Sequence, residues 1–352
     1  MNLNFNNCTA DKIFHLHSFL MPAHSKPMIF TLIFLIYSIT VLGNVFIISL
    51  ICLISQFHTP MYFFLCNLSI QDIIYVSDTL PKLLAITKSG DDRITFQVCI
   101  SQLFILVFCV GTEFLLLTSM AYDRYIAVCI PLHYAIIMKK LICILLAAVS
   151  WFVGLLNALT QSLILSHAEF CNSNDINHFY CDLKIMIKLA SSDTTIIQTY
   201  MSVIVAVMGF VPFRLILTSY ICIIHTIAKI RSSGGRIKAF SSCSSHLTVV
   251  LLFYGGALAT YTIPKSEHSQ EQEKLISLLY TALVPLLNPL VYTLRNKDVI
   301  MTIKHLPLQA GGIMIKKQEW MKKKKQGDAC IVSRQVQLPL KQGEEQAAHI
   351  LT

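Results

Sequence analysis

The stretch from Met120 to Tyr134 reads M-A-Y-D-R-Y-I-A-V-C-I-P-L-H-Y and overlaps the end of an apolar run, Val98 to Ala121, whose only charged residue is Glu113. An arginine after such a run sits at the edge of a membrane. We therefore expect Arg124 on the last turns of a spanning helix, which Pro131 ends or kinks. The simpler alternative is an arginine that only anchors a helix end.

The composition places the whole chain in a membrane. Of its 352 residues 55% are hydrophobic and 13% are charged, and the mean hydropathy is +0.62. Apolar runs that can cross roughly 30 Å of hydrocarbon at about 1.5 Å per residue lie at residues 28–54, 61–86, 98–121, 141–166, 196–227, 247–263 and 275–294. They are continuously apolar, whereas barrel strands alternate. We predict an all-α fold, a seven-transmembrane helix bundle.

Basic residues in the short loops indicate the orientation. They follow the third, fifth and seventh runs, at Lys139, Lys140, Lys229, Arg231, Arg236, Lys238, Arg295 and Lys297. By the positive-inside rule these loops are cytoplasmic, which puts the N-terminus outside and the C-terminus in the cytoplasm. Lys184 and Lys188, after the fourth run, go against the rule.

The domain organisation follows from this orientation. Residues 1–27 form an extracellular N-terminus without a visible cleavable signal peptide, residues 28–298 the seven-helix domain, and residues 299–352 a cytoplasmic tail that we expect to be disordered. From residue 295 onward the chain has eleven Lys and Arg against five Asp and Glu. This excess favours anionic lipid of the bilayer over nucleic acid as a partner.

Several polar residues lie inside the apolar runs. Asp72 and Glu113 should face the bundle interior, and two close acids either keep one proton or share a cation. Asn44 is expected to make an interhelical hydrogen bond. Arg214 costs about 3 kcal/mol at a central position on insertion scales. Either it turns inward towards water or it hinders folding and export.

The cysteines divide by compartment. Cys8, Cys99, Cys171 and Cys181 fall on the side predicted to be outside, where three pairings are open to them. The others lie in the membrane or the cytosol, where free thiols are the default. Asn7 begins the triplet Asn7-Cys8-Thr9, which fits the glycosylation pattern on the outer side.

Several motifs together resemble the olfactory receptor family of rhodopsin-like G-protein-coupled receptors over about residues 28–300. Besides Met120–Tyr134, the stretch Phe57–Asp72 is similar to the family's L-H-x-P-M-Y-x-F-L-x-x-L-S-x-x-D, with Phe57 for leucine. Lys238–Leu247, K-A-F-S-S-C-S-S-H-L, resembles K-A-F-S-T-C-x-S-H-L. Pro285–Asp298 closes the last run with P-L-L-N-P-L-V-Y-T-L-R-N-K-D.

The resemblance implies a disulfide between Cys99 and Cys181 and a sodium ion as the cation held by Asp72 and Glu113. The chain departs from the family at Ser191, where a cysteine is usual. Cys171 is then either an odd thiol or the partner of Cys8.

The family's function is implied as well. A small neutral hydrophobic volatile ligand would enter among the third, fifth, sixth and seventh helices, steered by a hydroxyl of Tyr254, Tyr261 or Thr281. The positions that would face it carry no fixed charge, which argues against amines and carboxylates. These positions are Leu106, Val107, Val110, Gly111, Ile204, Met208, Tyr254, Leu258, Tyr261, Leu278 and Thr281. Helical spacing alone would equally make them core residues.

Signalling is implied at the opposite end. Arg124, released from Asp123, would meet Tyr220 and Tyr292 and open a cleft for a stimulatory heterotrimeric G protein, raising cyclic AMP at the plasma membrane. The residues assigned to this activation are Asp123, Arg124, Tyr125, Tyr220, Asn288, Pro289 and Tyr292.

Three alternatives stay open. A transporter or channel also uses buried acids, but the sequence shows neither similar halves nor paired broken helices. A decayed receptor would be explained by Ser191, Arg214 and the long tail. An enzyme is not expected, because a metal site at His15 and His17, or at His178, lacks a full ligand set.

Overall fold

The computed structural model describes residues 12–19, 22–171, 173–262 and 269–294, together with 299 and 301. All the helices and strands named below belong to one compact unit that ends at Arg295. Asn7, Cys8, the side chain of Tyr261 and the tail from residue 302 lie outside the described residues. The predictions made for them remain predictions.

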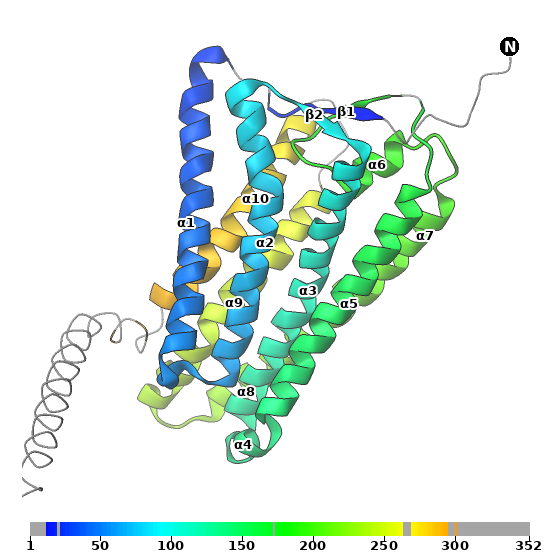
Figure 1. Cartoon of the computed structure of the whole chain (residues 1–352). Helices are drawn as coiled ribbons and strands as arrows, with labels where there is room; N and C mark the ends of the chain where they lie inside the picture. The colour runs from blue at the N-terminus through cyan, green and yellow to red at the C-terminus, as the bar shows by residue number, and fades with distance from the viewer. Residues whose placement is uncertain are drawn as a thin grey trace, which may run out of the picture. The chain divides into compact units, whose positions relative to one another are not determined.

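Long helices make up the unit (Figure 1). They are α1 (Lys26–Leu53), α2 (Pro60–Ser89), α3 (Phe96–Cys129), α5 (Lys140–Ser166), α7 (Thr195–Ile204), α8 (Val211–Lys229), α9 (Ser233–Thr262) and α10 (Ser269–Leu294). A π-helical turn, η5 (Val205–Phe210), joins α7 to α8, so these three form one continuous row. Short helices α4 (Tyr134–Ile137) and α6 (Leu183–Leu189) lie in connections. Each of the seven predicted runs falls on helix over nearly all of its described residues.

The length and hydropathy of most of these helices agree with the predicted membrane spans. In the described part of the chain, five helices are long and apolar enough to span a membrane, and α9 is a sixth if its two halves, bent by 41°, count as one span. The remaining long helix, α2, carries Asp72, Asp78, Lys82 and Lys88, which lower its hydropathy. The sixth run was predicted to begin at residue 247, but α9 begins at Ser233. Its first turns are polar, so hydropathy did not detect them.

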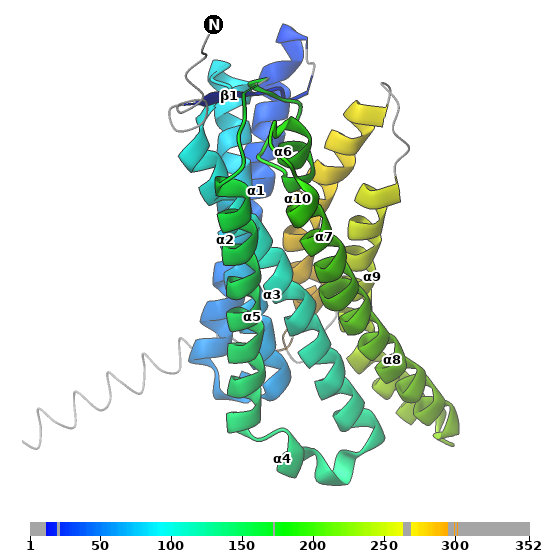
Figure 2. The same ribbon diagram turned by 90° about the vertical axis from the view of Figure 1, so that its right-hand side faces the viewer.

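The helix α3 packs against α2, α5 and α8 (Figure 2). Its approach to α5 depends on Gly154. A Cβ atom at this position would overlap the Thr112 hydroxyl and would lie 3.0 Å from Thr112 N and 3.1 Å from Phe108 O. As predicted, α3 ends just before Pro131, with Ile130 outside the helix.

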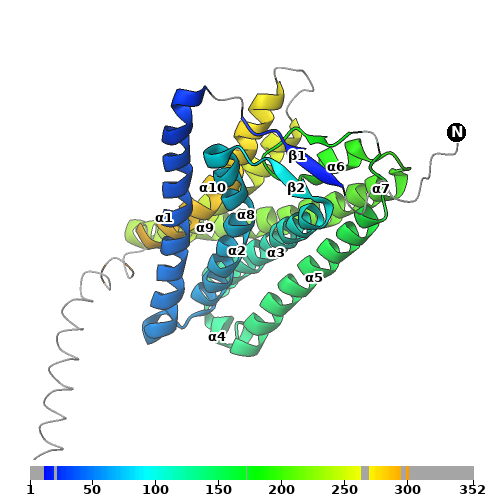
Figure 3. The ribbon, with the colours of Figure 1, turned by 45° about the horizontal axis from the view of Figure 1, so that its top comes forward.

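A small sheet covers the end of the bundle at which α3 begins (Figure 3). Strand β1 (Ile13–Leu16) pairs antiparallel with β2 (Arg93–Thr95) and parallel with β3 (Asp175–Ile176). Phe14 and Leu16 on β1 are fully buried. His15 Nδ1 lies 3.1 Å from Asp92 Oδ1. The all-α prediction omitted this sheet, whose short strands come from distant parts of the sequence.

Candidate functional site

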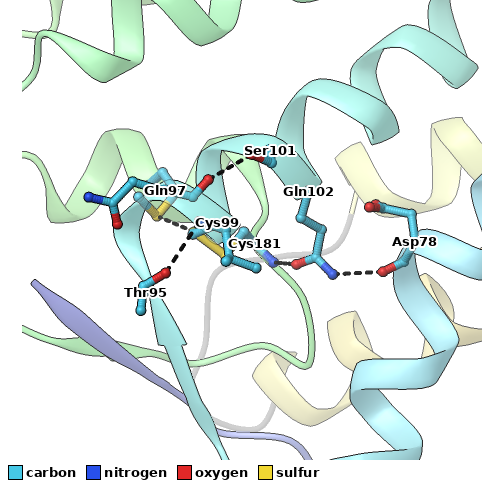
Figure 4. Close-up of a disulfide and its surroundings, with 9 residues drawn as sticks. Asp78, Thr95, Gln97, Cys99, Ser101, Gln102 and Cys181 are labelled. Atoms are coloured by element: carbon cyan, nitrogen blue, oxygen red, sulfur yellow. Dashed lines mark hydrogen bonds between the residues drawn. A yellow bond between two sulfur atoms is a disulfide. The ribbon is translucent and has the colours of Figure 1, made fainter.

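The disulfide predicted between Cys99 and Cys181 is present, with Cα atoms 5.5 Å apart (Figure 4). It ties the loop that follows α5 to the first turn of α3. Next to it, Gln102 Oε1 accepts a hydrogen bond from Cys181 N at 2.9 Å. Gln102 Nε2 donates to Asp78 O on α2, also at 2.9 Å. The loop is therefore held against two helices.

Ser191, the departure from the family pattern, makes hydrogen bonds within the same loop. Its Oγ accepts from Cys171 N at 3.0 Å, and its backbone N donates to Glu169 O at 2.7 Å. Two distant parts of the loop are thus joined by hydrogen bonds at Ser191.

Between the helices and this loop lies a cavity of about 210 Å³. It is bounded by α2, α3, α5, the α7–η5 part of the row, α9, α10 and the loop after α5. Six of the predicted ligand-facing positions line it: Leu106, Val107, Val110, Gly111, Ile204 and Met208. They are apolar, and they come from α3 and from the α7–η5 part of the row.

Those predicted positions on α9 and α10 whose side chains the structure describes do not line the cavity. Leu258 is 63% exposed, and Tyr254 packs against Phe114 with ring centroids 5.3 Å apart. Thr281 is fully buried and donates to Ser277 O at 2.6 Å. Leu278 packs into the core between helices. On α9 it is Ala257 that lines the cavity.

The cause is helix rotation. Tyr254, Leu258 and Tyr261 share one face by helical spacing. Ala257 precedes Leu258 in the chain, so its side chain points about 100° away from that of Leu258 around the helix axis. The family analogy selected these positions, and neither it nor helical spacing determined which face of α9 points inward.

Sequence reasoning also missed polar residues of the cavity. Asn157 and Gln161, four residues apart on α5, line it, as do Asp182, Lys184 and Glu273 at the end covered by the loop. A signal for the first two was present, because they are polar residues one helical turn apart in an apolar run. They were overlooked because the family analogy placed the ligand among other helices.

The charged residues of the cavity are engaged with one another or with the backbone. Lys184 Nζ lies 3.5 Å from Glu273 Oε1. Asp182 Oδ1 accepts from Lys184 N at 2.9 Å, at the start of α6. Burial raises the pKa of Asp182, and the charge of Lys184 opposes this rise. The positions predicted to face the ligand carry no charge, whereas this end of the cavity does.

His178 also lines the cavity and is 3% exposed. Burial, and then the positive charges of Lys274 and Lys184, lower its pKa to about 3. The ring is therefore neutral at physiological pH. It stacks on Phe179 with centroids 4.6 Å apart.

The predicted acid pair lies deeper in the bundle. Asp72 accepts from Asn288 Nδ2 at 3.0 Å, and Glu113 Oε2 accepts from Gln71 Nε2 at 2.9 Å. Three buried oxygens, Glu113 Oε1, Gln71 Oε1 and Asn288 Oδ1, have no hydrogen-bond partner in the described part of the chain. Oxygens of this kind are the ligands of hard cations, so the residues fit an ion such as sodium. Asn44 donates to Pro285 O on α10 at 3.2 Å, which confirms its interhelical bond.

At the other end of α3, Arg124 Nε donates to Asp123 Oδ2 at 2.9 Å. Asp123 is fully buried, and its second oxygen accepts from the Tyr134 hydroxyl at 2.7 Å. Tyr125, the next residue, is half-buried. Arg124 and Asp123 thus form an intact ion pair, which we call the closed pair.

The hydroxyls of the two tyrosines predicted to receive Arg124 do not bond to it in this structure. The Tyr220 hydroxyl lies 2.7 Å from His246 Nδ1, and His246 Nε2 lies 3.1 Å from Leu117 O on α3. The Tyr292 hydroxyl is buried and has no partner among the described residues. Asn288 and Pro289 lie within α10, which continues past them to Leu294.

A helical membrane bundle with a disulfide-anchored loop over a cavity, and with a buried Asp-Arg pair at the far end of α3, has the features of a G-protein-coupled receptor. The model for the family described as olfactory receptor matches residues 33–310. Olfactory receptor 2T11 of Homo sapiens is 44% identical over 296 residues, which are 84% of this chain and 94% of the relative. Olfactory receptor-like protein OLF3 of Canis lupus familiaris is 48% identical over 271 residues, covering 77% and 86% of the two chains.

The chain therefore belongs to the olfactory receptor family. It is an odorant-sensing receptor that spans the plasma membrane several times and whose partners are odorants and a G protein. It is a signalling receptor and not an enzyme, and the transporter alternative is set aside.

Proposed function

We propose that this receptor binds small neutral hydrophobic odorants in the cavity beside α3 and that binding activates a stimulatory heterotrimeric G protein, raising cyclic AMP. The observation that carries this proposal is the cavity of about 210 Å³ with an apolar wall from α3 and the α7–η5 row. Its charges are concentrated where the loop covers it. A charged ligand would have to compete with the Lys184–Glu273 pair.

The cavity suits a ligand of modest affinity. A molecule of about ten heavy atoms that gains roughly 0.6 kcal/mol from each would bind with about 6 kcal/mol, which corresponds to tens of micromolar. Most of this energy comes from removing apolar surface of the ligand from water.

We place the disulfide end of the bundle outside the cell and the Arg124 end in the cytoplasm. Disulfides persist in oxidising compartments, whereas the basic loops after α3 and between α8 and α9 favour the cytoplasmic side. Asn7 then lies on the outer side, where it is our candidate for glycosylation.

Activation would open the closed pair. In the active state Arg124 leaves Asp123 and meets Tyr220 and Tyr292, while α9 moves outward and exposes a cleft for the G protein. The odorant drives this change only to the extent that it binds the active state more tightly. The buried hydroxyl of Tyr292 has no partner among the described residues, so it is available for such a contact.

We further propose that a sodium ion is held by oxygens of Asp72, Glu113, Gln71 and Asn288. Such an ion would offset one negative charge of the two buried acids in the resting bundle, so that they could share it.

The G-protein part of the proposal is tested with Arg124→Ala in cells screened against a panel of neutral volatiles. We expect normal surface staining and no cyclic AMP response. Arg93→Ala is a matched control, since Arg93 also bonds a nearby aspartate, Asp91 at 3.3 Å, but at the opposite end. Unchanged signalling in Arg124→Ala would refute the role of this residue.

The ligand-site part is tested by filling the cavity. Val110→Phe places a larger side chain in the wall and should weaken the response to every active odorant. Val203→Phe is the control, because Val203 is 54% exposed on the outer surface. Equal responses of the two variants would place the ligand elsewhere.

A further inference from the structure

Asn157 on α5 is a polar residue of the cavity wall that uses only its amide oxygen in hydrogen bonds. It is 7% exposed and lines the cavity. Its Oδ1 accepts from Gln161 Nε2 at 2.8 Å and from the Tyr200 hydroxyl at 3.3 Å. Its Nδ2 makes no hydrogen bond to any residue that the structure describes.

The two bonds to Oδ1 fix the orientation of this amide. If Asn157 alone were turned over, its Nδ2 would face the Nε2 of Gln161, donor against donor. If both amides were turned over, the two N–H donors of Gln161 would be buried without an acceptor. In the observed arrangement the buried atom that lacks a partner is the carbonyl oxygen, Gln161 Oε1. A carbonyl without a partner is better tolerated than such a donor group.

The free end of the amide faces the part of the cavity next to Gly111. A Cβ atom on Gly111 would lie 3.5 Å from Asn157 Nδ2 and 3.5 Å from Met208 Cε. Gly111, Met208 and Asn157 all line the cavity. Because Gly111 has no side chain, a ligand atom can approach Nδ2 there.

Of the hydroxyls first considered for steering the ligand, the two whose side chains the structure describes do not compete for this role. Thr281 Oγ1 donates to Ser277 O within its own helix. The Tyr254 hydroxyl is buried, and Tyr254 packs among aromatic rings outside the cavity wall.

We propose that Asn157 is the hydrogen-bond donor that selects, among hydrophobic ligands, those that carry an acceptor oxygen, such as ketones, aldehydes and esters. The inference rests on the proposed function, because it assumes that the odorant occupies this cavity. An amide nitrogen has two N–H donors and no acceptor capacity. It therefore favours a carbonyl compound over a hydrocarbon of the same shape, and Gln161 and Tyr200 act as positioning residues.

The test compares menthone with p-menthane, which have the same carbon skeleton and differ by one carbonyl oxygen. Binding to the full-length purified receptor is measured as thermal stabilisation over a concentration series, and cyclic AMP is measured separately in cells. From the net contribution of one hydrogen bond between neutral groups, we expect menthone to act at a concentration about five- to tenfold lower than p-menthane. Asn157→Leu should bring the two compounds to the same concentration.

Two further variants keep the test independent of any folding defect in Asn157→Leu. Gly111→Ala should reduce the preference for menthone, because its methyl group covers Nδ2 while all neighbours remain at ordinary contact distance. Asn67→Leu is the matched control. Asn67 accepts from Trp151 Nε1 at 2.9 Å, so it also bonds between helices, but it does not line the cavity. It should leave the preference intact.

The outcomes separate the two levels of the proposal. If menthone and p-menthane stabilise the native receptor equally, or if neither stabilises it, the proposed role of Asn157 is overturned. A preference for menthone that survives both Asn157→Leu and Gly111→Ala overturns it as well. A preference that these variants abolish supports the inference, even if cyclic AMP stays silent, and that silence would count against the proposed G-protein output alone.

Discussion

Removing the Tyr134 hydroxyl should raise the basal activity of the receptor. This hydroxyl donates to Asp123 Oδ1 at 2.7 Å, while the other oxygen of Asp123 binds Arg124. Burial, followed by the charge of Asp123, raises the pKa of Tyr134, so the phenol keeps the proton that it donates. Tyr134→Phe leaves the ring in place and deletes one bond that holds the closed pair.

The size of the effect follows from the kind of hydrogen bond. A bond to a charged acceptor contributes about 1.5–3 kcal/mol to stability. Tyr134 is only half-buried, so water replaces part of the bond and about 1 kcal/mol remains. That energy changes a two-state ratio about fivefold. If about 1% of the receptors were active without ligand, Tyr134→Phe would raise this fraction to about 5%.

The assay is ligand-free cyclic AMP in transfected cells, normalised to the receptor stained at the surface. Tyr122→Phe is the control, because Tyr122 lies next to Asp123 on α3 but is 40% exposed. It should behave like the wild type. If Tyr134→Phe has the basal output of Tyr122→Phe, the bond to Asp123 does not restrain activation and the reasoning is wrong.

Three other predictions concern stability and export. Gly154→Ala should lower the melting temperature, since overpacking against Thr112 costs about 1–3 kcal/mol and better helix propensity returns at most about 1 kcal/mol. Gly255→Ala is the control and should not lower it, because no atom lies within 4 Å of the new Cβ. Equal melting temperatures of the two variants would contradict the close approach of α5 to α3. The pKa of His178 in the folded protein, about 3, lies below the ordinary value of 6.5, so protonation of the unfolded chain lowers stability as pH falls below about 6.5, by about 2 kcal/mol at pH 5. His178→Phe should therefore melt with less dependence on pH between 7.4 and 5 than the wild type, and parallel curves would show that this ring does not resist protonation. Arg214, exposed on α8, costs about 3 kcal/mol if it inserts centrally, so Arg214→Leu should increase surface staining; a decrease would point to a required contact.

The positions of the helices follow closely from the sequence. The fourth run was predicted at residues 141–166, and α5 covers Lys140–Ser166. Such agreement is expected, because crossing hydrocarbon requires a continuous apolar stretch of fixed minimum length, and that is a local property of the chain. Where polar residues extend a helix beyond the membrane, as at Ser233 in α9, the same criterion fails.

The candidate site was predictable only in part. The predicted α3 positions, Leu106, Val107, Val110 and Gly111, line the cavity. On α9, however, Leu258 faces outward although Ala257 beside it faces the cavity. Periodicity specifies which residues share a face, and only packing against neighbouring helices decides the direction of that face.

The sequence by itself determined that this chain is a bundle of membrane helices with a buried acid pair and an Asp-Arg pair at the end of one helix, because hydropathy and charge act along the chain. The tertiary structure decided which distant side chains meet. Only after α5 packs on α3 through Gly154, and α7 comes beside α5, do Asn157 and Tyr200 form a fixed donor at the cavity wall. Contacts of this kind depend on the rotation and approach of whole helices, which local patterns do not encode.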